Sequence, residues 1–268
     1  MSPTLDFLNE AEKHLRHCLE AVRPKLLEAQ GNIEHHLKDD NSAVTEMDTF
    51  VESELAKALK KIDSSIPFGG EEGGVDFDKP TYWLVDPIDG TEPFIRGMPF
   101  ATNMISLIDR KESIFAVIYN FNIGDFYVAI KGHGATCNGH PIHVSNRPPN
   151  RAWITFSATT GKPGTYGLGD RLNQQVLSVR RYGAGGYDYT MVASGALEGR
   201  VAFNGHGHEW DFAPGTLLVK EAGGMVANIN SSTYDFRNYD HIAANPVVFD
   251  TLMKFMSQID HDAKNTAT

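Results

Sequence analysis

Cysteine is scarce in this chain of 268 residues, and the two that occur, Cys18 and Cys137, lie far apart. Neither belongs to a CxxC pair, so neither a disulfide framework nor a thiolate zinc site is expected. Long apolar runs are also missing, since no stretch approaches the roughly 18 apolar residues of a membrane span. The chain starts with Met-Ser-Pro-Thr-Leu-Asp, which lacks the basic and apolar regions of a signal peptide. We therefore expect a soluble cytoplasmic protein.

Cationic residues are in deficit. The chain has 24 Lys and Arg against 34 Asp and Glu, a net charge of −10, which argues against direct nucleic-acid binding. Three sequence motifs are missing as well. There is no Gly-x-x-x-x-Gly-Lys-Ser/Thr loop, no Gly-x-Ser-x-Gly nucleophile elbow, and residues 183–186 do not match Gly-x-Gly-x-x-Gly. These absences argue against a P-loop nucleotidase, a serine hydrolase and a dinucleotide-binding protein.

The first half of the chain predicts two amphipathic helices followed by an antiparallel meander. Apolar residues recur at helical spacing from Leu8 to Leu26 and again from Val51 to Ile62, and Pro24 should kink or end the first helix. Thr45 is a candidate N-cap for the second helix, with Asp48 three residues on as in a capping box. Strands are expected over 100–108, 114–119 and 126–130, because turn residues separate these β-prone runs.

The second half alternates predicted strands and helices, which indicates a layered α/β arrangement. Helices are expected over 172–177, after Gly186, over 212–222 with Asp211 as N-cap, and from Pro246 to Ile259. The segment Arg147-Pro148-Pro149-Asn150 is the best candidate boundary. We predict an N-terminal half, 1–147, and a C-terminal half, 148–268, that together form one functional unit.

One stretch combines a buried strand with paired carboxylates. The apolar run from Tyr82 to Val85 ends in Asp86-Pro87-Ile88-Asp89-Gly90-Thr91. Two hard anionic oxygens on constrained backbone suit a divalent metal with oxygen ligands, whereas a plain polar turn is the alternative. The N–H groups of Gly90 and Thr91 could cradle a phosphate if a helix starts there.

Other acidic residues stand at three further places: Asp48 at a helix start, Glu71 and Glu72 between glycine pairs, and Asp211 at a helix N-terminus. Taken alone, each of these places is equally consistent with a helix cap or a solvated loop. Two or three Mg²⁺ ions held by such oxygens would suit phosphoryl transfer, since one ion activates water and the others neutralise charge.

The motifs resemble those of the inositol monophosphatase family. Residues 83–91 resemble its first signature, and Glu209-Trp210-Asp211-Phe212-Ala213-Pro214-Gly215 resembles its second. Further similar motifs follow in the family's order: Val44-Thr45-x-x-Asp48, Gly70-Glu71-Glu72, Gly134-Ala135-x-x-Asn138-Gly139 and Ala244-Asn245-Pro246. The resemblance implies a five-layer αβαβα sandwich. It also implies a Mg²⁺-dependent, lithium-sensitive phosphomonoesterase that forms a homodimer.

The resemblance also implies roles for individual residues. Glu71, Asp86 and the Ile88 carbonyl would hold one metal, and Asp86, Asp89 and Asp211 a second, while Glu71 also reaches a third. Thr91, hydrogen-bonded to Asp48, would orient the attacking water, with Glu71 as a further catalytic residue. Glu72 and Lys38 would lie next to the metal ligands without binding a metal ion themselves. Substrate-binding residues would be Gly90, Thr91, Gly183, Ala184, Gly185, Asn204 and Asp211.

The predicted reaction is hydrolysis of a small phosphorylated alcohol, with inositol-1-phosphate as the leading substrate. Two departures from the family pattern lie on the substrate side: Gly183-Ala184-Gly185-Gly186 lacks a hydroxyl, and Asn204 stands where a glutamate is expected. Histidinol phosphate and a 3′(2′),5′-bisphosphate nucleotide are therefore alternative substrates. A regulatory binding protein of RNA processing or transcription is the alternative of a different class.

Overall fold

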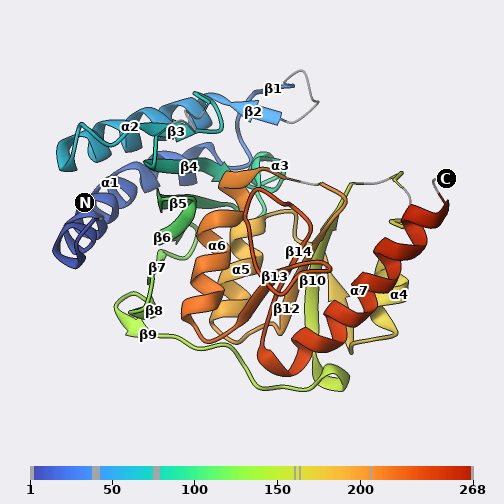
Figure 1. Cartoon of the computed structure of the whole chain (residues 1–268). Coiled ribbons are helices and arrows are strands. Elements are labelled where there is room, and N and C mark those ends of the chain that lie inside the picture. Colours follow the sequence, from blue (N-terminus) through green and yellow to red (C-terminus); the bar gives the residue numbers. More distant parts are fainter. Residues whose placement is uncertain are drawn as a thin grey trace.

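The computed structural model describes residues 3–37, 43–74, 79–159, 161–162, 164–205 and 207–266. Most of the strands belong to two sheets. The large sheet has seven strands in the order β3-β4-β5-β6-β7-β8-β9, and the small sheet has five in the order β11-β10-β12-β14-β13. Helices and sheets alternate in five layers: α1 with α2, the large sheet, α5 with α6, the small sheet, and α4 with α7 (Figure 1). The predicted αβαβα sandwich is confirmed.

The large sheet is the expected meander with one parallel strand added at its edge. Its strands are β3 (Phe68–Gly70), β4 (Thr81–Asp89), β5 (Thr102–Asp109), β6 (Glu112–Asn120), β7 (Asp125–Ile130), β8 (Gly134–Cys137) and β9 (His140–Pro141). Strand β3 pairs with β4 in parallel, and every later pair is antiparallel. Short strands β1 (His35–Leu37) and β2 (Ala43–Thr45) form a separate antiparallel pair.

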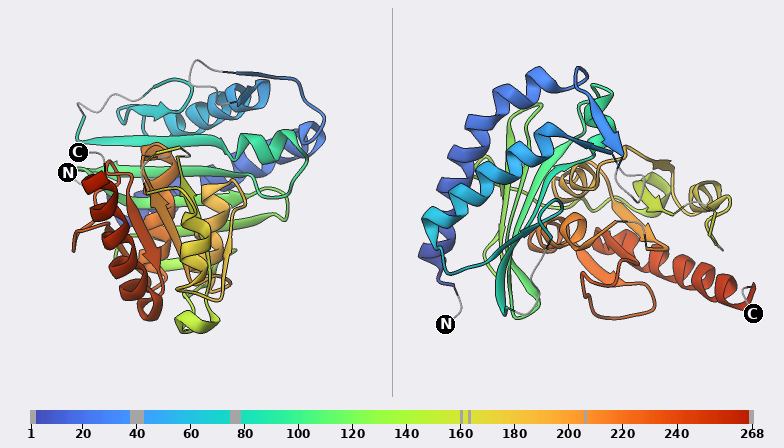
Figure 2. Two further views of the ribbon diagram at one scale, coloured as in Figure 1. Left: turned by 90° about the vertical axis from the view of Figure 1, so that its right-hand side faces the viewer. Right: turned by 90° about the horizontal axis from the view of Figure 1, so that it is seen from above.

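Helices α1 (Leu5–Ala29) and α2 (Glu46–Ile62) cover the outer face of the large sheet (Figure 2). Thr45 and Asp48 form the predicted capping box of α2. The expectation that α1 ends early at Pro24 is wrong, because the helix continues to Ala29. Leu26, beyond the proline, is fully buried against the sheet, and this packing offsets the lost helical hydrogen bond.

Strand β4 alternates between the two faces of the large sheet. Trp83 and Val85 pack toward α1 and α2, whereas Tyr82 and Leu84 pack with Ala213 of α6 (Glu209–Glu221). Because side chains on a strand alternate, Asp86 continues the second series and faces the middle helix layer. The apolar residues of β4 thereby position the first carboxylate.

The small sheet and its helices make up the rest of the sandwich. Its strands are β10 (Trp153–Ala158), β11 (Ser178–Arg180), β12 (Gly199–Phe203), β13 (Met225–Asn228) and β14 (His241–Ala244). One face packs on α5 (Gly185–Ala193) and α6, and the other on α4 (Leu168–Asn173) and α7 (Pro246–Thr266). The segment joining the two sheets holds a short 3₁₀ helix, Pro149–Arg151.

Three predicted boundaries in this half are wrong. Helix α4 precedes the expected 172–177, because Leu168 and Leu172 are the buried pair four residues apart. Helix α7 extends to Thr266 instead of Ile259. Helix α6 starts at Glu209, so Asp211 lies inside its first turn and His208 is the N-cap.

Helices α5 and α6 contact both sheets, so the middle layer belongs to both parts of the molecule. The division into 1–147 and 148–268 stays a prediction. None of the helices in the described ranges is long and apolar enough to cross a membrane.

Candidate active site

The carboxyl end of β4 departs from regular strand geometry. The pairing of β4 with β5 shifts register between Asp86 and Asp89. Two residues three apart would face opposite sides of a regular strand, but an irregularity around Pro87 turns both toward the middle layer. Carboxylate oxygens of Asp86, Asp89 and Asp211 consequently lie within 4.8 Å of one another.

Asp86 is buried with one oxygen unsatisfied. The side chain is 2 % exposed, and its Oδ1 has no hydrogen-bond partner. Burial, followed by the nearby charges of Glu71 and Asp211, raises the pKa of Asp86 well above its usual value. A buried polar atom without a partner is costly, so this oxygen marks a place where a cation fits.

Asp89 is equally buried but fully engaged. Its Oδ1 accepts the Gly185 N–H (2.8 Å), and its Oδ2 accepts the Gly186 N–H (2.8 Å) and the Thr102 hydroxyl (3.0 Å). The two N–H donors come from the first turn of α5, whose N-terminus favours an anion, and the hydroxyl donor Thr102 comes from β5. Burial nevertheless raises the pKa of Asp89 to about 7, with the Asp211 charge as the second cause.

Asp211 enters the cluster from the first turn of α6. Its Oδ2 accepts the His208 N–H at 2.6 Å, which holds the side chain back over the helix start. Burial is the main cause that raises its pKa, and a hydrogen bond with the Asp86 carboxyl opposes the shift. Two carboxyl groups can share a hydrogen bond only through a proton, and a divalent cation would replace that proton.

Glu71 and Glu72 lie beside this cluster in the turn after β3. The Glu71 N–H donates to the Val85 carbonyl (3.1 Å), which ties the turn to β4. The Glu71 charge acts on Asp86 and on Asp48, so Glu71 lies near both. Glu72 donates its N–H to Glu52 Oε2 at 3.0 Å. Sequence analysis missed Glu52, a buried acid in the apolar stripe of α2 that holds this turn in place.

Thr91 and Asp48 approach each other as the resemblance implies. The Thr91 hydroxyl lies 3.1 Å from the Ile88 carbonyl and 3.5 Å from Asp48 Oδ1. Asp48 Oδ2 accepts the N–H and hydroxyl of Thr45, at 2.8 and 2.6 Å. Burial raises the pKa of Asp48 to about 6, which brings it near the range of a general base. Helix α3 (Thr91–Ile95) starts directly after Gly90, so the condition for an N–H cradle is met.

The predicted substrate-side residues are only partly brought together. Gly90 has φ +83°, and a side chain there would meet the buried Ala184 at 2.7 Å. The Gly185 N–H is engaged by Asp89, so it is not available to a ligand. Asn204 follows β12 and accepts a hydrogen bond from Lys162 through its carbonyl (3.1 Å). Lys38 lies outside the described residues.

An ion pair behind Asp89 was not predicted. Arg200 of β12 pairs with Asp188 of α5, and both side chains are at most 5 % exposed. Arg200 also donates to Ser157 Oγ (3.1 Å), and its charge lowers the pKa of Asp89 against the effect of burial. The predicted strand covered only Val201 to Phe203, and β12 also includes Arg200. Arg200 was the missed signal, because a buried arginine requires an anionic partner.

The donor set defines a class of centre. Clustered carboxylate oxygens, without histidine or cysteine, suit a hard divalent cation such as Mg²⁺. A neighbouring hydroxyl–carboxylate pair and a helix start suit a phosphate ester and a water molecule. Together with the layered fold, these features define a metal-dependent phosphatase.

The chain belongs to the inositol monophosphatase family, whose model matches residues 5–261. An inositol monophosphatase of Mesembryanthemum crystallinum is 31 % identical over 96 % of this chain and 98 % of its own length. A putative Nus factor SuhB of Neisseria meningitidis serogroup B is also 31 % identical, over 94 % of this chain and 98 % of its own. The chain is therefore a phosphomonoesterase of this family.

Solved structures agree with the fold. An IMPase of Thermotoga maritima superimposes with a TM-score of 0.85 at 23 % identity, covering 97 % of this chain and all of its own. An IMPase/NADP phosphatase complexed with Mg²⁺ and phosphate has a TM-score of 0.81 at 20 % identity, covering 92 % of this chain and 95 % of its own. At these identities the likeness establishes the α/β sandwich.

Proposed function

We propose that the enzyme hydrolyses inositol-1-phosphate, or a closely similar phosphorylated cyclic alcohol, with Mg²⁺ as cofactor. Two observations carry the proposal: carboxylate oxygens of Asp86, Asp89 and Asp211 lie within 4.8 Å of one another, and the buried Asp86 Oδ1 has no hydrogen-bond partner. The relative named inositol monophosphatase, which matches nearly the whole chain, supports the choice of alcohol. Lithium inhibition, a homodimer and a cytoplasmic location belong to the same proposal.

The proposed metal ligands are Asp86, Asp89 and Asp211, with Glu71 and the Ile88 carbonyl completing the set. The solved relative with Mg²⁺ and phosphate supports magnesium. Bound Mg²⁺ would lower the pKa of a water molecule and withdraw charge from the ester. The number of ions, two or three, is part of the proposal.

The chain's own residues would position and deprotonate the water. The Thr91 hydroxyl donates toward Asp48 and accepts from the water, so a proton can pass through Thr91 to Asp48 Oδ1. The N–H groups at the start of α3 would hold the phosphate. In-line attack would form the bond from the water oxygen to phosphorus as the ester P–O bond breaks, and the leaving alkoxide would take a proton from a solvent water to become the alcohol, without a covalent enzyme intermediate.

Phosphate release from three substrates in Mg²⁺ tests this function. The panel holds inositol-1-phosphate, histidinol phosphate and a 3′,5′-bisphosphate nucleotide, compared by kcat/KM. We expect inositol-1-phosphate to lead by at least tenfold. If either other substrate has the highest kcat/KM, the proposed alcohol is wrong, whereas the proposed hydrolysis of a phosphate ester stands.

The SuhB relative favours a second candidate, a regulatory binding protein, because its identity to this chain is the same 31 %. A pull-down from a lysate separates the two functions. A stable partner that acts in transcription or RNA processing, combined with no turnover of any ester, would favour regulation. We expect turnover instead, since the carboxylate cluster is complete.

A further inference from the structure

A cavity of about 510 Å³ borders the amino end of β4, and its lining residue Glu209 precedes Asp211 by two residues on α6. Tyr82 lines it and precedes Asp86 by four residues, roughly 13 Å along the strand. Four of the lining residues are cationic and come from three segments of the chain: Lys79, Arg110, Lys111 and Arg237. Tyr82 and Phe236 supply apolar surface, and Glu209 is the lining carboxylate. The cavity is thus a cationic recess in a chain of net charge −10.

Three of the four cations of this recess lack an ion-pair partner within the described ranges, although the charges of Asp235 and Glu209 act on Lys111 and Arg237. The side chains of Lys79, Arg110 and Lys111 form no ion pair with another described residue. Arg237 pairs with Asp235 through two hydrogen bonds, at 2.8 and 2.6 Å. Lysines and arginines that line a shared hollow repel one another, so an anion placed among them is favoured.

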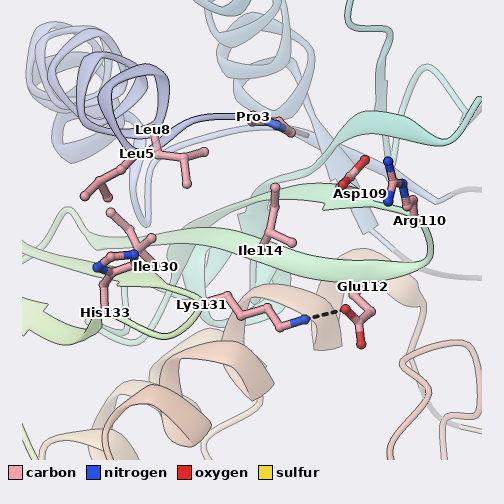
Figure 3. Close-up of a pocket in the computed structure, with 10 residues that line it drawn as sticks. All are labelled: Pro3, Leu5, Leu8, Asp109, Arg110, Glu112, Ile114, Ile130, Lys131 and His133. Atoms are coloured by element: carbon pink, nitrogen blue, oxygen red, sulfur yellow. Dashed lines mark hydrogen bonds and ion pairs between the residues drawn. The ribbon is translucent and has the colours of Figure 1, made fainter. Parts of the chain in front are cut away.

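A neighbouring hollow shows the contrast. It has a volume of about 330 Å³ and lies between the start of α1 and strands β5 to β7 (Figure 3). Its Lys131 forms an ion pair with Glu112 across the sheet (Figure 3). Its lysine therefore already has an anionic partner within the chain.

The backbone fixes where the cations of the larger cavity lie. Arg110 and Lys111 form the two-residue turn between β5 and β6, with φ values of +50° and +70°. This geometry is that of a type I′ hairpin, which matches the strand twist. The Arg110 N–H donates to the Pro80 carbonyl at 2.6 Å, which joins the turn to the segment carrying Lys79. Two of the three cationic segments are therefore held together before any ligand arrives.

Size and charge specify the ligand. A volume near 500 Å³ lies within the range of small-molecule pockets. A long nucleic acid would meet the repulsion of the whole acidic chain, whereas a compact anion would meet only the recess. We propose that this recess is a second ligand site, separate from the phosphatase centre, which binds a compact polyphosphate: free pyrophosphate or the diphosphate of a nucleotide.

Calorimetric titration of the full chain with pyrophosphate and with ADP, in EDTA at low salt, tests the site. Without divalent ions the Asp86 cluster repels anions, so binding there does not contribute. The test variant is Lys79→Gln with Lys111→Asn, because asparagine tolerates the positive φ of residue 111. The matched control is Lys57→Gln with Lys60→Gln, which removes two charges from α2.

We expect wild type and the control to bind pyrophosphate alike, and the test variant to bind at least tenfold more weakly with an unchanged melting temperature. Asp86→Asn should leave binding unchanged. ADP that binds at least tenfold more tightly than pyrophosphate assigns the site to a nucleotide, and the reverse assigns it to free polyphosphate. Equal loss in both lysine pairs, no binding at millimolar ligand, or tighter binding of single-stranded RNA would overturn the proposal.

Discussion

Asp86 and Asp89 lie three residues apart on one strand, yet their surroundings differ. Asp89 is held by the Gly185 and Gly186 N–H groups and by Thr102, whereas Asp86 keeps a buried oxygen without any partner. The chain therefore holds the Asp89 carboxyl in place with hydrogen bonds and leaves the Asp86 oxygen to be satisfied by a cation. We therefore expect Asp89 to contribute to the stability of the fold as well as to the reaction, and Asp86 to contribute to the reaction alone.

The largest expected effect comes from replacing each carboxylate by its amide. Asp86→Asn and Asp89→Asn should each lower kcat/KM by about three orders of magnitude, since each removes a charge from the metal centre. Phosphate release in Mg²⁺ measures both.

Unfolding by denaturant in EDTA then separates the two variants. Asp89→Asn should lose about 1–3 kcal/mol, because its amide offers one acceptor to donors that now use two carboxylate oxygens. Asp86→Asn should be as stable as wild type or more stable, since its amide can donate to Asp211 without a bound proton. Equal destabilisation would contradict the contrast between the two sites.

The next effect concerns the ion pair behind Asp89. Arg200→Met should cost about 3–5 kcal/mol, because Asp188 would remain buried without its partner. Adding Asp188→Asn should restore part of the loss. Arg96→Met is the matched control, since Arg96 and its partner Glu92 are both exposed, at 65 % and 57 %. A control that loses as much as Arg200→Met would show that burial is not the cause.

A further effect is expected from pH. The pKa values of Asp89 and Asp48, about 7 and about 6, exceed the unfolded value near 3.9. Between these values the folded state binds more protons, so the stability of the metal-free protein should fall as pH rises from about 4 to about 7. Saturating Mg²⁺ should reduce this fall, because it favours the ionised carboxylates. Melting temperatures at pH 5 and pH 8 measure it, and a metal-independent slope would contradict the expectation.

The smallest effect belongs to Thr91. Thr91→Ser keeps the hydroxyl and should change kcat by only a few fold, whereas Thr91→Val should lower it by about a hundredfold or more. Both should leave the melting temperature nearly unchanged, because Asp48 stays bonded to Thr45. Similar rates for both variants would remove Thr91 from the proposed proton path.

The sequence predicted the two N-terminal helices, the meander and the acidic residues because their signals are local, whereas the five-layer sandwich followed from the family resemblance. The apolar spacing of α1 and α2, the Thr45–Asp48 cap and the strand run into Asp86 can all be read within a few residues. Asp211 was predicted to be the N-cap of α6. The N-cap is His208 instead, and Asp211 lies three residues later in the first turn of the helix.

What the sequence could not reveal depends on contacts distant along the chain. Asp89 meets the N–H groups of α5 nearly a hundred residues later, and Glu52 supports a turn twenty residues away. The register shift at Pro87, which turns two carboxylates to one side, has no pattern of its own in the sequence. Substrate choice stays a prediction for the same reason, because the roles proposed for Asn204 and residues 183–186 depend on contacts between distant parts of the chain.

The most direct test of the metal centre is an anomalous difference map from crystals of the protein soaked in Mn²⁺. We predict a peak bonded to Asp86 Oδ1 and shared with the Asp89 and Asp211 carboxylates, and no such peak in Asp86→Asn. Full Mn²⁺ occupancy elsewhere, with Asp86 Oδ1 still unbonded, would contradict the assignment.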